Sequence, residues 1–148
     1  MRNEAVAELE GLVGVWELTL TNAWFLDSLD VRVFGTATFE WLDDAFIVWR
    51  WSLGGPDADE PVEIVMGYSD AQQEYMALYH DHRGVSRVFG MTWDGGSWTL
   101  LREDPDFHQR FVATAEPDRI LARFDASEDQ GGTWRNDFDL IFERPAKR

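Results

Sequence analysis

The densest group of side chains capable of chemistry lies in the segment YHDHRGVSR, from Tyr79 to Arg87. It holds His80 and His82, two of the chain's three histidines, together with Asp81, two arginines and a single glycine. These residue types can bind a metal ion, transfer protons or form the polar end of a hairpin. Which of these applies depends on the strands that carry them.

A metal site in this segment would use its histidines. His80 and His82, two residues apart on a strand, project to the same face, and His108 from another strand could complete a site with three nitrogen ligands. However, no spacing specifies the third ligand, and Gly84 indicates a turn close to solvent, with residues 81–83 forming the end of a hairpin. We therefore expect no metal and no cofactor.

Acid–base or nucleophilic chemistry finds little support in the same segment. Tyr79 and Asp81 face one side of a strand and His80 the other, so the three cannot easily act together. The serines stand in no nucleophile elbow and form no evident Ser–His–acid set. The sequence therefore identifies no catalytic residue.

Alternation of apolar and polar residues with period two runs through nearly the whole chain and predicts half-buried strands. One exception is residues 3–14, where Val6, Leu9 and Val13 have helical spacing and Asn3 is suited to cap a short helix. The predicted strands are joined by short turns and cover residues 15–22, 30–41, 45–53, 61–69, 73–81, 84–93, 97–103, 107–115, 119–126 and 133–143.

A meander of about ten strands would leave hydrogen-bonding edges exposed unless it closed on itself. We therefore expect an all-β fold: a single closed up-and-down antiparallel β-barrel with a short N-terminal helix. No linker divides the chain, which indicates one domain over residues 1–148.

Composition excludes several classes of function. The formal net charge of -15 disfavours nucleic acid and anionic membrane surfaces as partners, and most acids fall in candidate turns such as PDADEP at residues 56–61. The absence of cysteine excludes disulfides, thiol catalysis and thiolate metal sites. With no apolar run of membrane-spanning length and no secretory signal, we expect a cytoplasmic monomer or homodimer.

Large aromatic and polar side chains share the expected inner face of the barrel. The bulky rings of eight tryptophans and ten phenylalanines either fill the interior of a barrel as plain core or line a cavity inside it, and a ten-stranded barrel is too wide to be filled by ordinary side chains alone. Arg87 and Arg102 fall on the same faces of their strands as neighbouring aromatic residues, so they are expected to point inward with them. A buried arginine must be paired, either with a ligand or with an acid such as Asp81, Asp137 or Asp139. The candidate ligand-binding residues are Trp49, Trp51, Tyr79, Arg87, Phe89, Trp98, Arg102, Gln109 and Asn136.

Several motifs resemble known families of ligand-holding barrels. Gly14-Val15-Trp16 after a short helix is similar to the G-x-W of the calycins, the superfamily of lipocalins and fatty-acid-binding proteins. A closer resemblance, to an uncharacterised lipocalin-like family of bacterial, often actinobacterial, proteins, covers most of the chain. It is carried by four stretches: FEWLDDAFIVWRW, YHDHRGVSRVF, WTLLREDPDFHQRF and WRNDFDLIFER.

The resemblance implies a barrel whose first and last strands meet, with Arg144 lying across Trp16. In the family's pattern, the positions of His80 and His82 are open, which weakens the metal hypothesis. Nitrobindin-type barrels hold haem through a histidine on a late strand, and no histidine follows His108. We therefore expect no haem.

Three hypotheses about function remain after these considerations. The first is a protein that binds a small, mostly apolar molecule with a polar or acidic end inside the barrel, as fatty-acid-binding calycins do. The second is a cofactor-independent enzyme of bacterial small-molecule metabolism, a cyclase or isomerase, on the same barrel. The third is an interaction protein with a solidly packed barrel.

Overall fold

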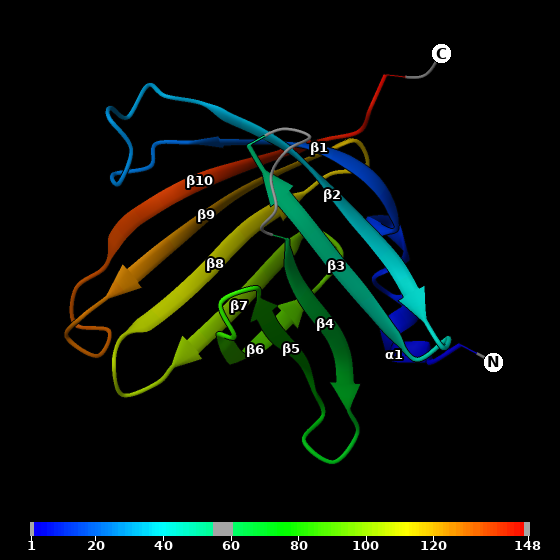
Figure 1. Cartoon of the computed structure of the whole chain (residues 1–148). Helices are drawn as coiled ribbons and strands as arrows, with labels where there is room; N and C mark the ends of the chain where they lie inside the picture. Colours follow the sequence, from blue (N-terminus) through cyan, green and yellow to red (C-terminus); the bar gives the residue numbers. More distant parts are fainter. Residues whose placement is uncertain (1, 55–60, 147–148) are drawn as a thin grey trace.

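The chain forms a closed antiparallel barrel in the computed structural model, which describes residues 2–54 and 61–146. Within these residues ten strands follow one another around the barrel, each paired with its neighbours in sequence, and β1 pairs with β10 to close it (Figure 1). The strands are β1 (Gly14–Thr21), β2 (Val33–Leu42), β3 (Phe46–Leu53), β4 (Val62–Ser69), β5 (Glu74–Asp81), β6 (Ser86–Trp93), β7 (Ser97–Glu103), β8 (His108–Ala115), β9 (Arg119–Ser127) and β10 (Arg135–Glu143).

The number, order and closure of the strands confirm the prediction from the alternating pattern. Three strands begin two or three residues later than expected, because their first predicted residues belong to turns. Gly84, for example, has a φ of +82° and its N–H bonds to the carbonyl of Asp81, so the β5–β6 hairpin turns there, as expected. The acidic turn expected at residues 56–61 lies, apart from Pro61, outside the described residues.

The N-terminal segment closes one end of the barrel. α1 (Glu4–Ala7) is capped by Asn3, whose side chain accepts a hydrogen bond of 3.0 Å from the backbone N–H of Val6, as predicted. A 3₁₀ turn, η1 (Glu10–Leu12), follows, and the change of pitch turns Leu12 inward while Val13 is only half-buried. Val6, Leu9 and Leu12 thus pack into the core and form an apolar plug. No helix in the described part of the chain is long and apolar enough to span a bilayer.

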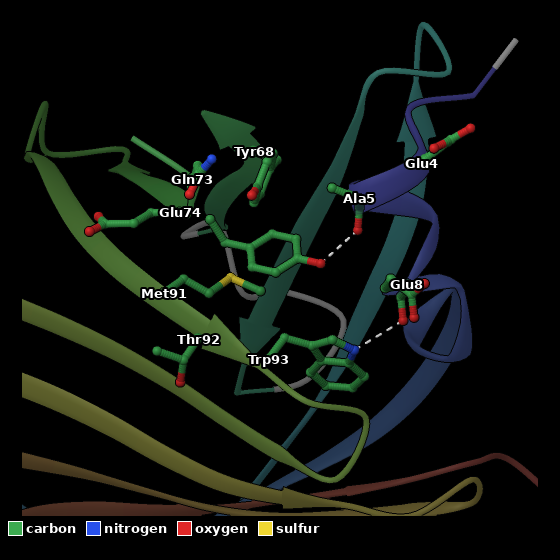
Figure 2. Close-up of a pocket in the computed structure, with 10 residues that line it drawn as sticks. Glu4, Ala5, Glu8, Tyr68, Gln73, Glu74, Met91, Thr92 and Trp93 are labelled. Carbon is green, nitrogen blue, oxygen red and sulfur yellow. Dashed lines mark hydrogen bonds between the residues drawn. The ribbon is translucent and has the colours of Figure 1, made fainter. Parts of the chain in front are cut away.

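Polar side chains of the barrel wall tie this plug in place. The Tyr75 hydroxyl donates a 2.7 Å hydrogen bond to the carbonyl of Ala5, and the indole N–H of Trp93 donates one of 3.0 Å to the carbonyl of Glu8 (Figure 2). The bond from Trp93 gives the carbonyl of Glu8 a partner at the end of the short helix, and the bond from Tyr75 is a second one for the carbonyl of Ala5, which also accepts from the backbone N–H of Glu8. Burial raises the pKa of Tyr75, and the carboxylate of Glu8 raises it further, so the hydroxyl keeps its proton.

We expect Tyr75→Phe to lower the free energy of unfolding by about 1 kcal/mol, because one hydrogen bond is lost while the ring packing is kept. Tyr68→Phe is the matched control, since within the described residues the Tyr68 hydroxyl has no hydrogen-bond partner. Urea unfolding of the two variants measures the difference. Equal stability of both variants would contradict the role of Tyr75 in holding the plug.

The seam between the first and last strands is covered by Arg144, as predicted. Its guanidinium carbon lies 3.7 Å from the ring centroid of Trp16, and its nitrogens donate to the carbonyls of Gly11, Val13 and Val15 at 2.9, 3.1 and 3.3 Å. A Cβ on Gly14, whose φ is +124°, would lie 2.8 Å from this guanidinium. The glycine of the G-x-W motif therefore makes room for the arginine as well as adopting the required backbone conformation.

Aromatic rings fill the middle of the barrel. Trp49 lies at their centre, with its ring centroid 5.1 Å from Trp98, 5.4 Å from Phe39 and 5.7 Å from both Phe111 and Phe142. All five side chains are fully buried or nearly so. The middle of the barrel is thus solid core, and any ligand must lie nearer to one of its ends.

Candidate functional site

A cavity of about 410 Å³ lies inside the barrel at the end opposite the plug. Its rim comes from the β1–β2, β5–β6 and β7–β8 connections and the start of β10, which an up-and-down meander places at one end (Figure 1). The volume is within the usual range for small-molecule sites, roughly 300–1,000 Å³. This region, called the wide-end cavity below, is the candidate site.

Apolar side chains from six strands form the floor and walls of the wide-end cavity: Trp51, Ile64, Phe89, Leu100, Phe124 and Phe138. Phe25 and Phe107 add rings from the β1–β2 and β7–β8 connections. Polar groups are fewer and come from Tyr79, Arg83, Arg87, Gln109 and Asp137. An apolar wall with a few convergent polar groups is typical of sites for amphipathic small molecules.

The segment from Tyr79 to Arg87 supplies one polar edge of this cavity. The Tyr79 hydroxyl donates to Asp81 at 2.9 Å, and Arg83 donates two side-chain hydrogen bonds to the same Asp81 oxygen at 2.6 and 3.1 Å. The bonds from Arg83 hold the pKa of Asp81 well below its usual range, whereas burial and the bond to Asp81 raise the pKa of Tyr79. The cluster is thus a fixed ion pair with a protonated tyrosine, and its geometry is that of a hairpin end.

We expect Asp81→Asn to destabilise the protein at neutral pH and much less in acid. A depressed folded-state pKa means that the carboxylate stabilises the fold above its unfolded pKa of about 3.9, and that this stabilisation disappears as the pH falls through the lower folded value. Urea unfolding of both proteins from pH 7 to pH 2 tests this, with Asp70→Asn, at an exposed turn position, as control. A difference between wild type and variant that is constant over this range would contradict the assignment.

Arg87 lines the cavity without an ion-pair partner among the described residues. Its guanidinium carbon lies 5.2 Å from the ring centroid of Phe107 and 5.9 Å from that of Tyr79. The side chain is half-buried on the inner face of β6, in phase with Phe89 as predicted. Two aromatic rings therefore hold a cation whose hydrogen-bonding groups remain available to the cavity.

Arg102 is buried, as predicted, but its guanidinium pairs with carboxylates of the protein itself and is not available to a ligand. Only 5% of the residue is exposed, and its nitrogens lie 2.8 Å from Asp104, 2.8 Å from Asp106 and 2.9 Å from the carbonyl of Phe107. The prediction of Asp81, Asp137 or Asp139 as partner was wrong, because the β7–β8 loop folds its own carboxylates back over the arginine. Arg102 fastens that loop and is absent from the cavity wall.

Five of the nine candidate ligand-binding residues meet in the wide-end cavity, and four do not. Trp51, Tyr79, Arg87, Phe89 and Gln109 line it, whereas Trp49, Trp98, Arg102 and Asn136 lie elsewhere. Trp49 and Trp98 belong to the solid core. Asn136 was expected on the inner face, but its amide nitrogen lies 3.1 Å from Asp139 and 3.4 Å from Asp125, away from the cavity.

A β-bulge explains both the position of Asn136 and a wall residue that the sequence analysis missed. The β9–β10 register shifts between Asn136 and Phe138, so Asn136 pairs with Asp125 and Asp137 is the extra residue. One inserted residue reverses the direction of the side chains that precede it. Asp137 therefore joins the cavity wall beside Phe138.

The three histidines lie away from the wide-end cavity. His80 and His82 are exposed on the outer side of the β5–β6 hairpin, and His108 is half-buried beside Trp134, with ring centroids 6.5 Å apart. The described residues contain no group of three or more potential metal ligands from His, Cys, Asp and Glu. The histidines thus contribute nothing to the wide-end cavity.

A second hollow of about 580 Å³ lies at the plugged end of the barrel, between α1 and strands β4–β6 (Figure 2). Its walls include Tyr68, Tyr75 and Trp93, with Glu4 and Glu8 from the helix. The polar ends of Tyr75 and Trp93 already bond to the helix backbone. We therefore assign this groove to the attachment of the plug and the wide-end cavity to ligand binding.

Comparisons with known proteins establish the fold. Searches against protein-family models and curated proteins found no match. Among solved structures, the chain is similar to Rv2717c from M. tuberculosis, with a TM-score of 0.69 and 10% identity over 99% of this chain and 100% of that one. It also resembles a de novo designed fluorescence-activating β-barrel, with a TM-score of 0.45 and 17% identity over 92% and 95% of the two chains. The first similarity supports the ten-stranded barrel and says nothing of its ligand.

Proposed function

We propose that this protein binds a small, mostly apolar molecule with an acidic end in the wide-end cavity. The observation that carries the proposal is Arg87, a cation on the wall of an aromatic cavity with no carboxylate partner among the described residues. A carboxylate or phenolate in the cavity would form charge-assisted hydrogen bonds with this guanidinium. Gln109, on the neighbouring wall, adds a neutral donor and acceptor.

Burial of the apolar body supplies most of the affinity in this proposal. Trp51, Phe89 and Phe124 are each at least 93% buried and present ring surface to the cavity. Each square ångström of apolar surface removed from water contributes about 25 cal/mol, so a body of modest size gains several kcal/mol. Arg87 then fixes the orientation of the ligand, with its acidic end near the rim.

A second candidate is a cofactor-independent cyclase or isomerase acting on the same class of molecule. The observation that favours it is Asp137, a carboxylate on the cavity wall where it could accept a proton from a bound substrate. The Tyr79 hydroxyl lies on the same wall but donates to Asp81. Binding is the better-supported function, because it requires only groups that are in place.

We also propose that the chain is a lipocalin-like member of the calycin superfamily, of bacterial type. The arrangement of Trp16 and Arg144 at the seam of the barrel supports this proposal. The net charge of -15 supports a small molecule rather than nucleic acid as partner. We take the protein to be a cytoplasmic monomer or homodimer formed by a single domain.

Native mass spectrometry of protein purified from its own host tests the proposed function. The expected result is a retained compound that ionises in negative mode after extraction and is missing from the Arg87→Ala protein. A wild-type protein that carries no adduct and also binds no 3-(2-naphthyl)propanoate, an apolar acid suited to the cavity, would contradict the proposal. Conversion of the extracted compound to an isomer on incubation would favour the enzyme.

A further inference from the structure

Two opposite charges face the wide-end cavity without pairing with each other. Arg87 stands on β6 and Asp137 at the start of β10, and among the described residues neither forms an ion pair. The third charged group of the wall, Arg83, is paired with Asp81. A partly buried charge is stabilised by a partner, and a bound ligand could supply one to each of these two residues.

The position of Asp137 is fixed by the backbone and by a tryptophan. The bulge turns the residue toward the cavity, and one carboxylate oxygen accepts a 2.9 Å hydrogen bond from the indole N–H of Trp24. The backbone N–H of Trp24 bonds to the carbonyl of Asp137 as well, at 3.4 Å. Within the described residues the second carboxylate oxygen has no partner, so an oriented acceptor remains available at the cavity.

The presence of Asp137 changes which ligands the cavity favours. A plain apolar acid gains from Arg87 but also brings its negative charge into a cavity that already holds a carboxylate, and this repulsion offsets part of the gain. A hydrogen-bond donor on the ligand near its acidic group would remove this conflict, because it could bond to the free oxygen of Asp137.

On this basis, which rests on the proposed function, we propose that the ligand of the wide-end cavity is an apolar acid with a hydroxyl or ammonium group close to its acidic group. Arg87 binds the acidic group and Asp137 binds the donor. Molecules of the 2-hydroxy acid or 2-amino acid type with a large apolar side chain fit this description.

Three probes with the same apolar body separate the two contacts. 3-(2-Naphthyl)propanoate carries the acid alone, 2-hydroxy-3-(2-naphthyl)propanoate adds a hydroxyl, and 3-(2-naphthyl)alanine adds an ammonium group. Calorimetric titration at pH 7 gives their affinities for the wild type and for Asp137→Asn, which keeps the acceptor for Trp24. Asp139→Asn is the matched control, since the same charge is removed two residues away, where Asn22 and Asn136 bond to it.

The wild type is expected to bind at least one donor-bearing probe about tenfold more tightly than the plain acid, the effect of one charge-assisted hydrogen bond. Asp137→Asn should abolish this preference and bind the plain acid at least as well as the wild type does, while Asp139→Asn should behave like the wild type. Equal binding of all three probes, or tightest binding of the plain acid, would overturn the inference and leave the proposed function standing. Binding of none of the three would count against the proposed function itself.

Discussion

Arg87→Ala is expected to weaken the binding of 3-(2-naphthyl)propanoate roughly 10- to 100-fold. The variant removes charge-assisted hydrogen bonds worth about 1.5–3 kcal/mol, and every 1.4 kcal/mol corresponds to a factor of ten in affinity. Because Arg87 has no ion-pair partner among the described residues, its removal leaves no described carboxylate stranded, and the unfolding midpoint should change little. Titration calorimetry combined with thermal unfolding measures both quantities.

Arg50→Ala is the control for this prediction, because it removes the same charge from the outer surface of β3, where Arg50 pairs with Glu63 at 2.8 Å. Its affinity for the acid should equal that of the wild type. If both variants lose affinity equally, the effect comes from the general field of an acidic protein and the anchoring role of Arg87 is wrong.

Arg144→Ala is expected to lower the free energy of unfolding by about 3 kcal/mol. The estimate combines a cation–π contact worth about 2 kcal/mol when partly desolvated with the loss of donors to three carbonyl groups at the plug. For a chain of this length, the unfolding midpoint should fall by roughly 6–12 °C. Burial lowers the pKa of Arg144, but a guanidinium remains charged at every accessible pH. The loss of stability in Arg144→Ala should therefore be the same at all pH values at which the protein folds.

Affinity for the acid probe should survive in the folded Arg144→Ala protein, because Arg144 bonds to the carbonyls of Gly11 and Val13 at the plugged end of the barrel, whereas the cavity lies at the other end. Arg144→Lys should recover only part of the stability, since an ammonium cannot lie flat on Trp16 while donating to several carbonyls. Arg119→Ala, an exposed arginine at the start of β9, serves as control. Loss of binding at unchanged stability would reverse our assignment of the two ends.

Features that follow from local chemistry could be predicted from the sequence. Strict alternation identified ten strands because each strand has one face on the core, and the short turns left closure as the remaining way to satisfy the edges. The cap at Asn3 and the turn at Gly84 each depend on one residue type in one position, whereas the contact of Arg144 with Trp16 was predicted from the resemblance to the calycins. The inward phase of Arg87 followed from the same alternation.

The parts of the site that could not be predicted depend on breaks in that regularity. The sequence NDFD, residues 136–139, carries no signal that predicts a bulge. Alternation therefore predicted that Asn136 faces inward and that Asp137 does not line the cavity. The pairing of Arg102 with Asp104 and Asp106 depends on how a loop folds back, which period-two patterns do not encode. Phe25 lies in the β1–β2 connection, where no pattern indicates which aromatic ring turns toward the interior.

Trp49 and Trp98 show a further limit of the sequence. Their inward phase was predicted correctly, but the depth of each residue along the barrel depends on the strand register, which places both in the solid core. A ring at the same phase two residues away, Trp51, reaches the cavity. The division of an aromatic interior into core and ligand wall therefore had to come from the structure.

A crystal structure of the protein with 3-(2-naphthyl)propanoate tests the central claim most directly. Our account predicts the naphthyl ring among Trp51, Phe89 and Phe124, with a carboxylate oxygen within about 3 Å of an Arg87 nitrogen. An empty wide-end cavity in a crystal that holds the acid elsewhere, for instance in the groove beside α1, would contradict it.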